Sequence, residues 1–181
     1  MRVEELALQI CRTLESWPSV EIPGLGTFER NSHGVISFRE KKQPTIFIAY
    51  AVEDVEVVER LYGDLETRGY SPWMDRKKLL PGQNWPRRIH DAIESADFFI
   101  ACFSTTSAGK RGAFQAEIRY ALDSASKIPL DEVFLIPVRL DECRVPLRIE
   151  RETQYVDLFP VWEMGMARIV RIIEKQRRIA A

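Results

Sequence analysis

Few residue types in this sequence could carry out chemistry. His33 and His90 are its only histidines, so Ser-His-Asp triads and histidine-based metal sites have almost no material. Its three cysteines, Cys11, Cys102 and Cys143, are an odd number without CxxC spacing, which argues against a zinc site or a disulfide framework. Any chemistry must therefore rest on carboxylates, hydroxyls, amides or cations.

Charge and hydropathy exclude several classes of protein. The chain has 181 residues with 26 Lys and Arg against 27 Asp and Glu, a net charge of -1, so we expect no nucleic acid partner. The longest apolar runs, such as Phe98 to Phe103, are far shorter than the roughly 18 residues that span a bilayer, so we expect no membrane partner. The acidic start at Glu4 and Glu5 is unlike a signal peptide. These features predict a cytoplasmic protein.

From residue 44 onward the sequence alternates between strand and helix patterns. The apolar runs 45–50 and 97–103 are typical of strands buried on both faces, and amphipathic helical patterns separate them from further short strands. This alternation predicts an α/β domain over 44–181: an open parallel sheet flanked by helices on both faces. The expected strands are 45–50, 70–74, 97–103, 133–138 and 154–156, and the expected helices are 54–68, 85–95, 112–124 and 161–177.

Such sheets bind ligands beyond the carboxyl ends of their strands. The segment 49–54 that follows the first strand contains no glycine, which excludes a GxGxxG dinucleotide fingerprint or a P-loop there. The segment 75–84 is expected to form a long loop, in which Pro81 and Gly82 set a turn.

The domain contains five notable segments in this order: 46–50 with Asp54, 72–75 with 79–85, 93–104, 110–117 and 134–138. Together they resemble a TIR (Toll/interleukin receptor) domain of the bacterial kind. The resemblance covers about residues 44–177 and implies a flavodoxin-like fold. Many bacterial TIR domains cleave the nicotinamide–ribose bond of NAD+, releasing nicotinamide and forming ADP-ribose or a cyclic isomer, often in anti-phage defence. Other members only assemble with partner TIR domains, and fold alone does not choose between these roles.

The resemblance implies that Glu117 is the catalytic residue. One carboxylate beside an oxocarbenium-like ribose stabilises its positive charge, and nicotinamide leaves without a general acid. The residues alone leave a second interpretation open, in which Glu117 is an acid of the first helical turn, stabilised by the helix dipole. The sequence departs from the family pattern at Ala113, where members usually carry an aromatic residue, and at Ala49, where they usually carry serine.

Further residues are candidates for binding the substrate, each with a structural alternative such as core packing or a solvated loop position. No cofactor is expected besides NAD+ as the substrate. The expected partners are a second copy of the TIR domain and a downstream effector that senses the nucleotide product, with non-catalytic TIR assembly as the alternative function. The candidates are Tyr50, Asp75, Lys77, Leu79, Trp85, Ser104 and Phe114.

The first 43 residues have a different pattern. Apolar positions over 3–17 follow one helix face, and short apolar alternations with glycine-containing turns predict a β-meander over 20–38. The polar connector 39–44 marks the boundary, so we expect a small module over 1–43. Its helix and the following stretch from Val20 to Phe28 resemble part of an HU-type DNA-binding fold, although the arms that grip DNA are missing. We expect a dimerisation or docking module, with a DNA contact as the alternative.

Overall fold

The structure is a computed structural model, which describes residues 3–22, 26–40, 43–107, 113–125 and 132–179. The chain forms two compact units, an N-terminal unit over 1–43 and a C-terminal unit over 44–181. Two predicted features, most of the turn at 23–26 and the helix start at Gly112, lie outside the described residues.

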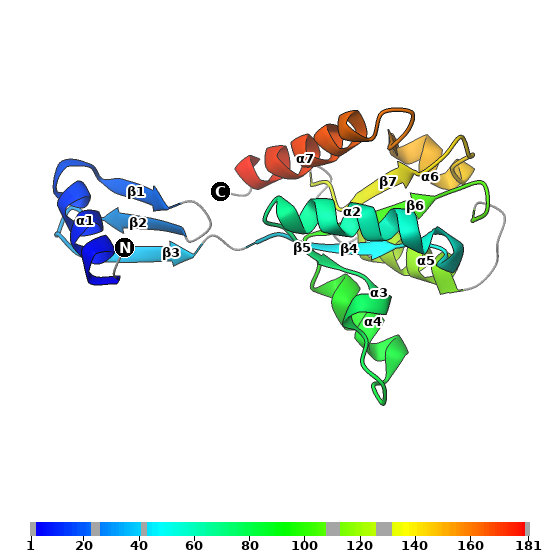
Figure 1. Cartoon of the computed structure of the whole chain (residues 1–181), viewed down its shortest axis with the longest axis horizontal. Coiled ribbons are helices and arrows are strands. Elements are labelled where there is room, and N and C mark those ends of the chain that lie inside the picture. The colour runs from blue at the N-terminus through cyan, green and yellow to red at the C-terminus, as the bar shows by residue number, and fades with distance from the viewer. Residues whose placement is uncertain (1–2, 23–25, 41–42, 108–112, 126–131, 180–181) are drawn as a thin grey trace. The chain divides into compact units, whose positions relative to one another are not determined.

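The N-terminal unit is a helix beside a three-stranded antiparallel sheet (Figure 1). The sheet has the order β1-β2-β3, and its register places Val20, Phe28 and Phe38 in one cross-strand row. Gly34, with a φ of 79°, closes the β2–β3 turn by donating its N–H to Asn31, a backbone conformation that favours glycine. The elements are α1 (Val3–Ser16), β1 (Ser19–Ile22), β2 (Gly26–Arg30) and β3 (Ile36–Glu40).

The C-terminal unit is built on a five-stranded parallel sheet, which confirms the predicted fold class. The strand order is β5-β4-β6-β7-β8. Every residue of β6 is buried, because helices cover the sheet on both faces and no edge of this strand is free. The strands are β4 (Thr45–Ala49), β5 (Ser71–Trp73), β6 (Phe98–Phe103), β7 (Leu135–Arg139) and β8 (Val156–Asp157).

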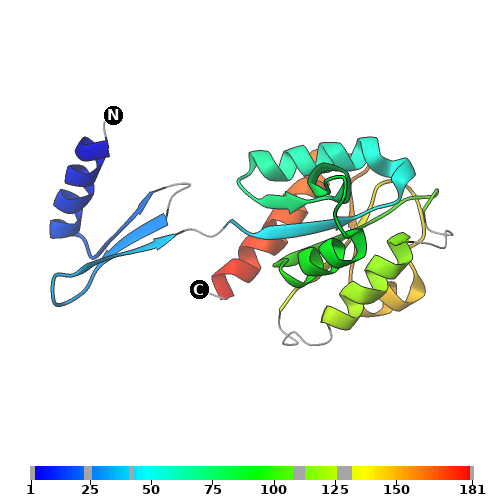
Figure 2. The same cartoon turned by 90° about the horizontal axis from the view of Figure 1, so that it is seen from below.

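Two cores lie on opposite faces of this sheet (Figures 1 and 2). Side chains alternate along each strand, so Ile48 and Ile100 join one core while Phe47 and Phe99 join the other. The helices α2 (Val55–Thr67) and α7 (Trp162–Ile179) cover the first face. The second face is covered by α4 (Trp85–Glu94), α5 (Ala113–Ala125) and α6 (Leu147–Glu152).

Two short helices depart from the sequence prediction. The segment 75–84 was expected to be a loop throughout, but α3 (Asp75–Lys78) begins it directly after β5. The helix α6 lies between β7 and β8, where no helix was expected. α3 has four residues and α6 has six. Helices this short contain too few apolar residues to show the helical spacing in the sequence.

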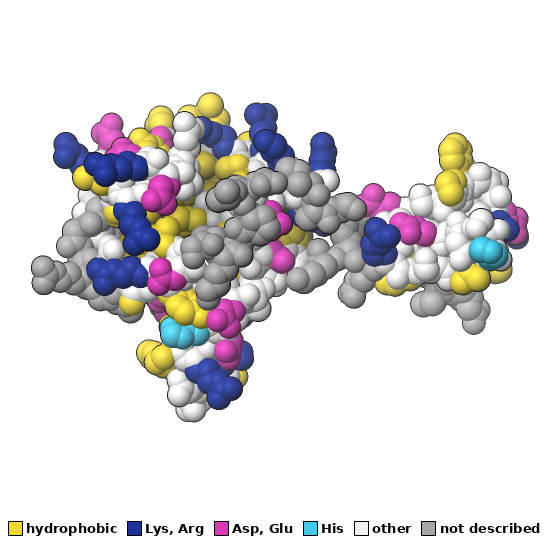
Figure 3. All heavy atoms as spheres, turned by 180° about the vertical axis from the view of Figure 1, so that it is seen from behind, with side chains coloured by type: hydrophobic (Ala, Val, Ile, Leu, Met, Phe, Trp, Pro, Cys, Tyr) yellow, Lys and Arg dark blue, Asp and Glu magenta, His cyan; other side chains and the backbone are white. Residues whose placement is uncertain are grey.

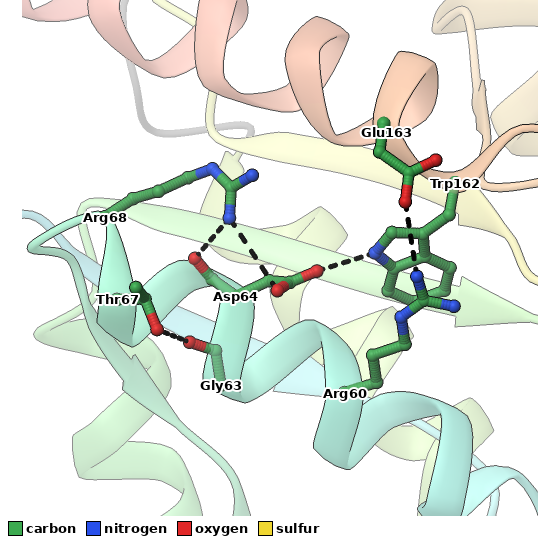
Figure 4. Close-up of polar contacts among 7 residues, drawn as sticks. All are labelled: Arg60, Gly63, Asp64, Thr67, Arg68, Trp162 and Glu163. Atoms are coloured by element: carbon green, nitrogen blue, oxygen red, sulfur yellow. Dashed lines mark hydrogen bonds and ion pairs between the residues drawn. The ribbon is translucent and has the colours of Figure 1, made fainter.

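Polar contacts join α2 to α7 at the surface of the first face (Figure 4). The Trp162 indole N–H donates to an Asp64 carboxylate oxygen at 2.6 Å. The Arg60 guanidinium lies 4.2 Å from the centre of the Trp162 ring, and it reaches Glu163 at 3.5 Å. Below these contacts, a Cβ at Gly165 would lie 2.3 Å from the carbonyl oxygen of Asp157, so α7 packs directly on the β8 backbone.

Candidate functional site

The ends of two neighbouring strands bring Tyr50 and Asp75 together. Tyr50 follows β4, and Asp75 begins α3 after β5, which pairs with β4. The Tyr50 hydroxyl donates to Asp75 Oδ1 at 2.5 Å, and the same oxygen accepts the Arg76 backbone N–H at 2.7 Å. Burial raises the pKa of Tyr50 above its ordinary value, and the hydrogen bond to Asp75 raises it further. The phenol therefore stays protonated and fixes the orientation of the Asp75 carboxylate.

Glu117 lies on α5, which covers the opposite face of the sheet from α2. It follows buried Phe114 and precedes buried Ile118, and its own side chain is partly buried. Burial raises the pKa of Glu117 from 4.5 to about 7, and the negative charge of Asp75 adds to the effect. Glu117 makes no hydrogen bond or ion pair with the residues that the structure describes. The carboxylate is thus desolvated and near a second acid, but its oxygens are not committed to a neighbour.

The three side chains Tyr50, Asp75 and Glu117 form the candidate site. One acid is held by a phenol, and the other, Glu117, has a pKa of about 7 and can therefore be neutral or charged at pH 7. A pair of this kind suits a reaction in which positive charge develops on a bound substrate. The arrangement lies at the carboxyl ends of the strands, where ligands bind in open parallel sheets.

Ser104 belongs to a separate, buried polar network. Its hydroxyl donates to Asp54 Oδ2 at 2.8 Å and lies 2.8 Å from the Thr106 hydroxyl, while its N–H donates to Ser107. Ser104 is only 2% exposed, so its hydroxyl fixes the loop after β6 rather than facing a substrate. Asp54 stands at the N-cap of α2, but its carboxylate makes no capping bond there and accepts hydrogen bonds from Ser104 and Thr106.

Sequence reasoning missed this network as a unit, although the run of four hydroxyl residues at 104–107 was a signal for it. Thr106 and Ser107 form hydrogen bonds with Ser104. The Thr105 hydroxyl donates to Asp141, which follows β7, at 2.8 Å. Hydroxyl side chains often bond to nearby backbone and carboxylate groups in loops. The network therefore joins the segments that follow β6 and β7.

The other predicted substrate contacts are spread over α3, the loop that follows it and the start of α4. The Lys77 ammonium lies 4.9 Å from the centre of the Tyr62 ring on α2, a cation–π distance. Leu79 is half-buried at the end of α3, and Trp85 is 59% exposed at the start of α4. Asn84 caps that helix by accepting the Arg87 N–H at 3.2 Å. The structure shows no contact of these three side chains with Glu117 among the residues it describes.

Phe114 is in the core rather than in the candidate site. It is 8% exposed, and its ring meets Phe103 edge-on with centroids 5.6 Å apart. Phe114 therefore packs in the core, which was the structural alternative to substrate binding. Ala49 is fully buried in the same core, and the segment 110–112 of the family pattern lies outside the described residues.

The described part of the chain contains neither a candidate metal site nor a candidate membrane-spanning helix. No three His, Cys, Asp or Glu side chains come together there in a way that could hold a metal ion. Among the described residues, no helix combines the length and the apolar character needed to span a membrane.

Solved structures share this fold. The TIR domain of the Toll-related receptor TRR-2 from Hydra magnipapillata is 25% identical, with a TM-score of 0.55, over 70% of this chain and 97% of that one. A metazoan TIR-STING receptor from C. gigas, solved with 2',3'-cGAMP, is 20% identical with a TM-score of 0.57, over 70% of this chain and 38% of that one. These likenesses agree with the strand order and layers described above.

Sequence comparison gives the family. The uncharacterized protein y4cD of Sinorhizobium fredii (strain NBRC 101917 / NGR234) is 27% identical over 137 residues, 75% of this chain. The chain spans about a fifth of that relative's length, 21%. The TIR domain pattern itself matches residues 46–170, which include the three residues of the candidate site and all of the five-stranded sheet except Thr45, the first residue of β4. The chain belongs to the TIR domain family.

Proposed function

We propose that the C-terminal unit is an NAD+ glycohydrolase or cyclase that cleaves the nicotinamide–ribose bond. The observation that carries the proposal is Glu117, a partly buried carboxylate without a described partner whose pKa is raised to about 7. An acid that serves only as a surface charge has no reason to be desolvated, because burial of the ionised form is costly. Membership in the TIR family supports the choice of substrate.

The proposed reaction makes modest demands on the protein. The bond between ribose C1′ and the pyridinium nitrogen breaks, and its electron pair leaves with nicotinamide, which becomes neutral. The sugar is left as an oxocarbenium ion, which the Glu117 carboxylate stabilises. Water then adds to C1′ and releases a proton to give ADP-ribose, or a nitrogen of the adenine adds instead to give a cyclic isomer. In this scheme Asp75, oriented by Tyr50, accepts hydrogen bonds from the ribose hydroxyls.

The electrostatics of the site fit a cationic substrate. Before binding, Glu117 is partly protonated at pH 7, because its pKa is about 7. The positive charge of the pyridinium ring favours the ionised carboxylate, so substrate binding lowers that pKa and creates the charge that the reaction uses. A neutral ligand lacks this effect, which gives the site a preference for oxidised over reduced nicotinamide.

The test is nicotinamide release from NAD+ by the full chain, measured by chromatography over a range of protein concentrations. We expect Glu117→Gln to lower the rate by about 100-fold or more, as removal of one charge-stabilising group does in other enzymes. Glu66→Gln, an exposed acid on α2, is the matched control and should leave the rate unchanged. Equal rates for Glu117→Gln and the unmodified chain, or no release at any concentration, would refute the proposal.

A non-catalytic scaffold is the second candidate, supported by exposed apolar side chains after α3. Leu80 is 61% exposed and Trp85 is 59% exposed, in a segment that protrudes from the sheet (Figure 1). In this case the TIR unit would recruit other TIR domains without chemistry. Capture of a TIR partner should then survive Glu117→Gln and fail when Pro81 and Gly82 are replaced.

The two candidates combine in the setting that we propose for the enzyme. Association of TIR units would switch on cleavage, and a downstream effector would sense the nucleotide product, as in bacterial defence against phage. Titration of nicotinamide release against protein concentration tests the first step, because association-dependent activity rises more steeply than in proportion to the protein.

A further inference from the structure

The N-terminal unit leaves much of its apolar surface uncovered. Of its large apolar side chains that the structure describes, only Ile10 and Leu14 are buried, while Val35, Ile36 and Phe38 are 58%, 43% and 46% exposed. Figure 3 shows hydrophobic side chains at the surface of this unit. A unit of about 40 residues rarely buries enough apolar surface to be stable without a further partner, metal or disulfide.

Two of these exposed side chains, Ile36 and Phe38, lie on one face of the sheet at its β3 edge. Cross-strand pairing puts Val20, Phe28 and Phe38 on the same face, with the rings of Phe28 and Phe38 only 4.6 Å apart. Arg30 on that face donates to the Leu14 carbonyl oxygen of α1 at 3.3 Å. The helix therefore covers this face over β1 and β2, and Ile36 and Phe38 remain exposed on the part over β3.

The outer side of the β3 backbone has no strand partner among the residues that the structure describes. β3 is an edge strand, and the Asn31 N–H donates to the Val35 carbonyl at the turn. In an antiparallel ladder the residues alternate between bonding across the pair and facing outward, so Ile36 and Phe38 direct their N–H and C=O groups away from β2. An exposed apolar strand with open backbone groups is a template for pairing with another strand.

We infer that β3 pairs with β3 of a second copy of this chain, so that the N-terminal unit is a homodimerisation module. Antiparallel pairing about a two-fold axis joins the two sheets into one of six strands and puts both apolar faces on the same side. The unit carries six basic and six acidic residues, so a second copy meets no net repulsion. Burial of Phe38 and Ile36 beside their counterparts adds the cross-strand contacts that stabilise sheets.

A second copy fits this surface better than other occupants. The edge offers alternating apolar and polar side chains that match another strand of the same alternation, and it offers no cluster of like charges for a nucleic acid. The inference goes beyond the proposed function, because it concerns the other unit and holds whether or not the TIR unit cleaves NAD+.

The first test is the mass of the full chain in solution, measured by light scattering and sedimentation over a dilution series. We expect a dimer that Phe38→Glu weakens by on the order of 100-fold, because the new charge would be buried at the interface. Ser37→Glu is the matched control: its side chain is on the polar face of the same strand, and the dimer should persist. Glu117→Gln should dimerise like the unmodified chain, which separates this inference from the catalytic proposal.

The second test needs no variant and remains valid if Phe38→Glu unfolds the unit. Amide hydrogen exchange of the unmodified chain should show the Ile36 and Phe38 N–H groups protected at high concentration and exposed on dilution. The Ser37 N–H faces β2 and should not depend on concentration. A monomer at every concentration, a dimer that Phe38→Glu and Ser37→Glu affect equally, or free exchange at Ile36 and Phe38 in the dimer would each overturn the inference.

Discussion

Replacing Glu117 by glutamine should stabilise the C-terminal unit at alkaline pH while removing activity. The pKa of Glu117 is about 7 in the folded chain, against 4.5 for an unperturbed glutamate, which approximates the unfolded chain. Between these two values the folded state holds a proton that the unfolded state has lost. The free energy of unfolding therefore falls as the pH rises from 4.5 to about 7, and above that the ionised carboxylate is buried at its full cost.

The magnitude follows from the difference between the two pKa values. One pKa unit corresponds to about 1.4 kcal/mol, so the full shift would be worth about 3 kcal/mol. Glu117 is partly exposed and solvent screens some of this cost, so we expect a gain of about 1 to 3 kcal/mol for Glu117→Gln at pH 8. A unit of this size gains about 2 to 4 °C in Tm for each kcal/mol.

The assay is thermal and urea unfolding of the full chain and the variant at pH 8 and pH 5. The gain should be largest at pH 8 and should shrink toward pH 5, where the folded unmodified chain is itself protonated at Glu117. Glu66→Gln should change the stability by less than about 0.5 kcal/mol at either pH. A Glu117→Gln variant that is no more stable at pH 8 would show that the carboxylate is not desolvated, and the reasoning behind the site would fail.

Three further predictions follow from the same contacts. The kcat/KM for NAD+ should fall as the pH drops below about 7, because the free enzyme then holds Glu117 protonated, and a pH–rate profile flat from 6 to 8 would contradict this. Tyr50→Phe removes the hydrogen bond to Asp75 and should lower the unfolding free energy by about 1.5 to 3 kcal/mol, with a KM effect on NAD+ if Asp75 orients the ribose; urea unfolding and kinetics measure both. Trp162→Phe keeps an aromatic ring but loses the donor to Asp64, and urea unfolding should show a loss of about 1 to 3 kcal/mol without any change in kcat.

The layered fold was predictable because the central strands are apolar along their whole length. The runs 46–50 and 98–103 are hydrophobic at every position, a pattern that a strand covered on both faces requires. The helix α3 was not predictable in the same way. Its four residues, 75–78, are all charged and contain no apolar repeat, so only the geometry of the chain after β5 makes them helical.

The candidate site was predictable in position but not in detail. The sequence order places Glu117 after a buried strand, and the fold brings that helix to the strand ends. The contact of Ser104 with Asp54 joins residues fifty positions apart, and no local pattern encodes a hydrogen bond over that separation. The hydroxyl that seemed available for a ribose is therefore occupied by a carboxylate, a fact that depends on tertiary packing.

The close approach at Gly165 restricts how the C-terminal unit can change shape. A Cβ at Gly165 would lie 2.3 Å from the Asp157 carbonyl oxygen, so even alanine would push the first turn of α7 away from β8. We therefore expect α7 and β8 to move together. The hydrogen bond from the Trp162 indole to Asp64 also links α7 to α2. A change of shape in this unit is therefore easier at the far margin of the sheet, where β5 leads into α3.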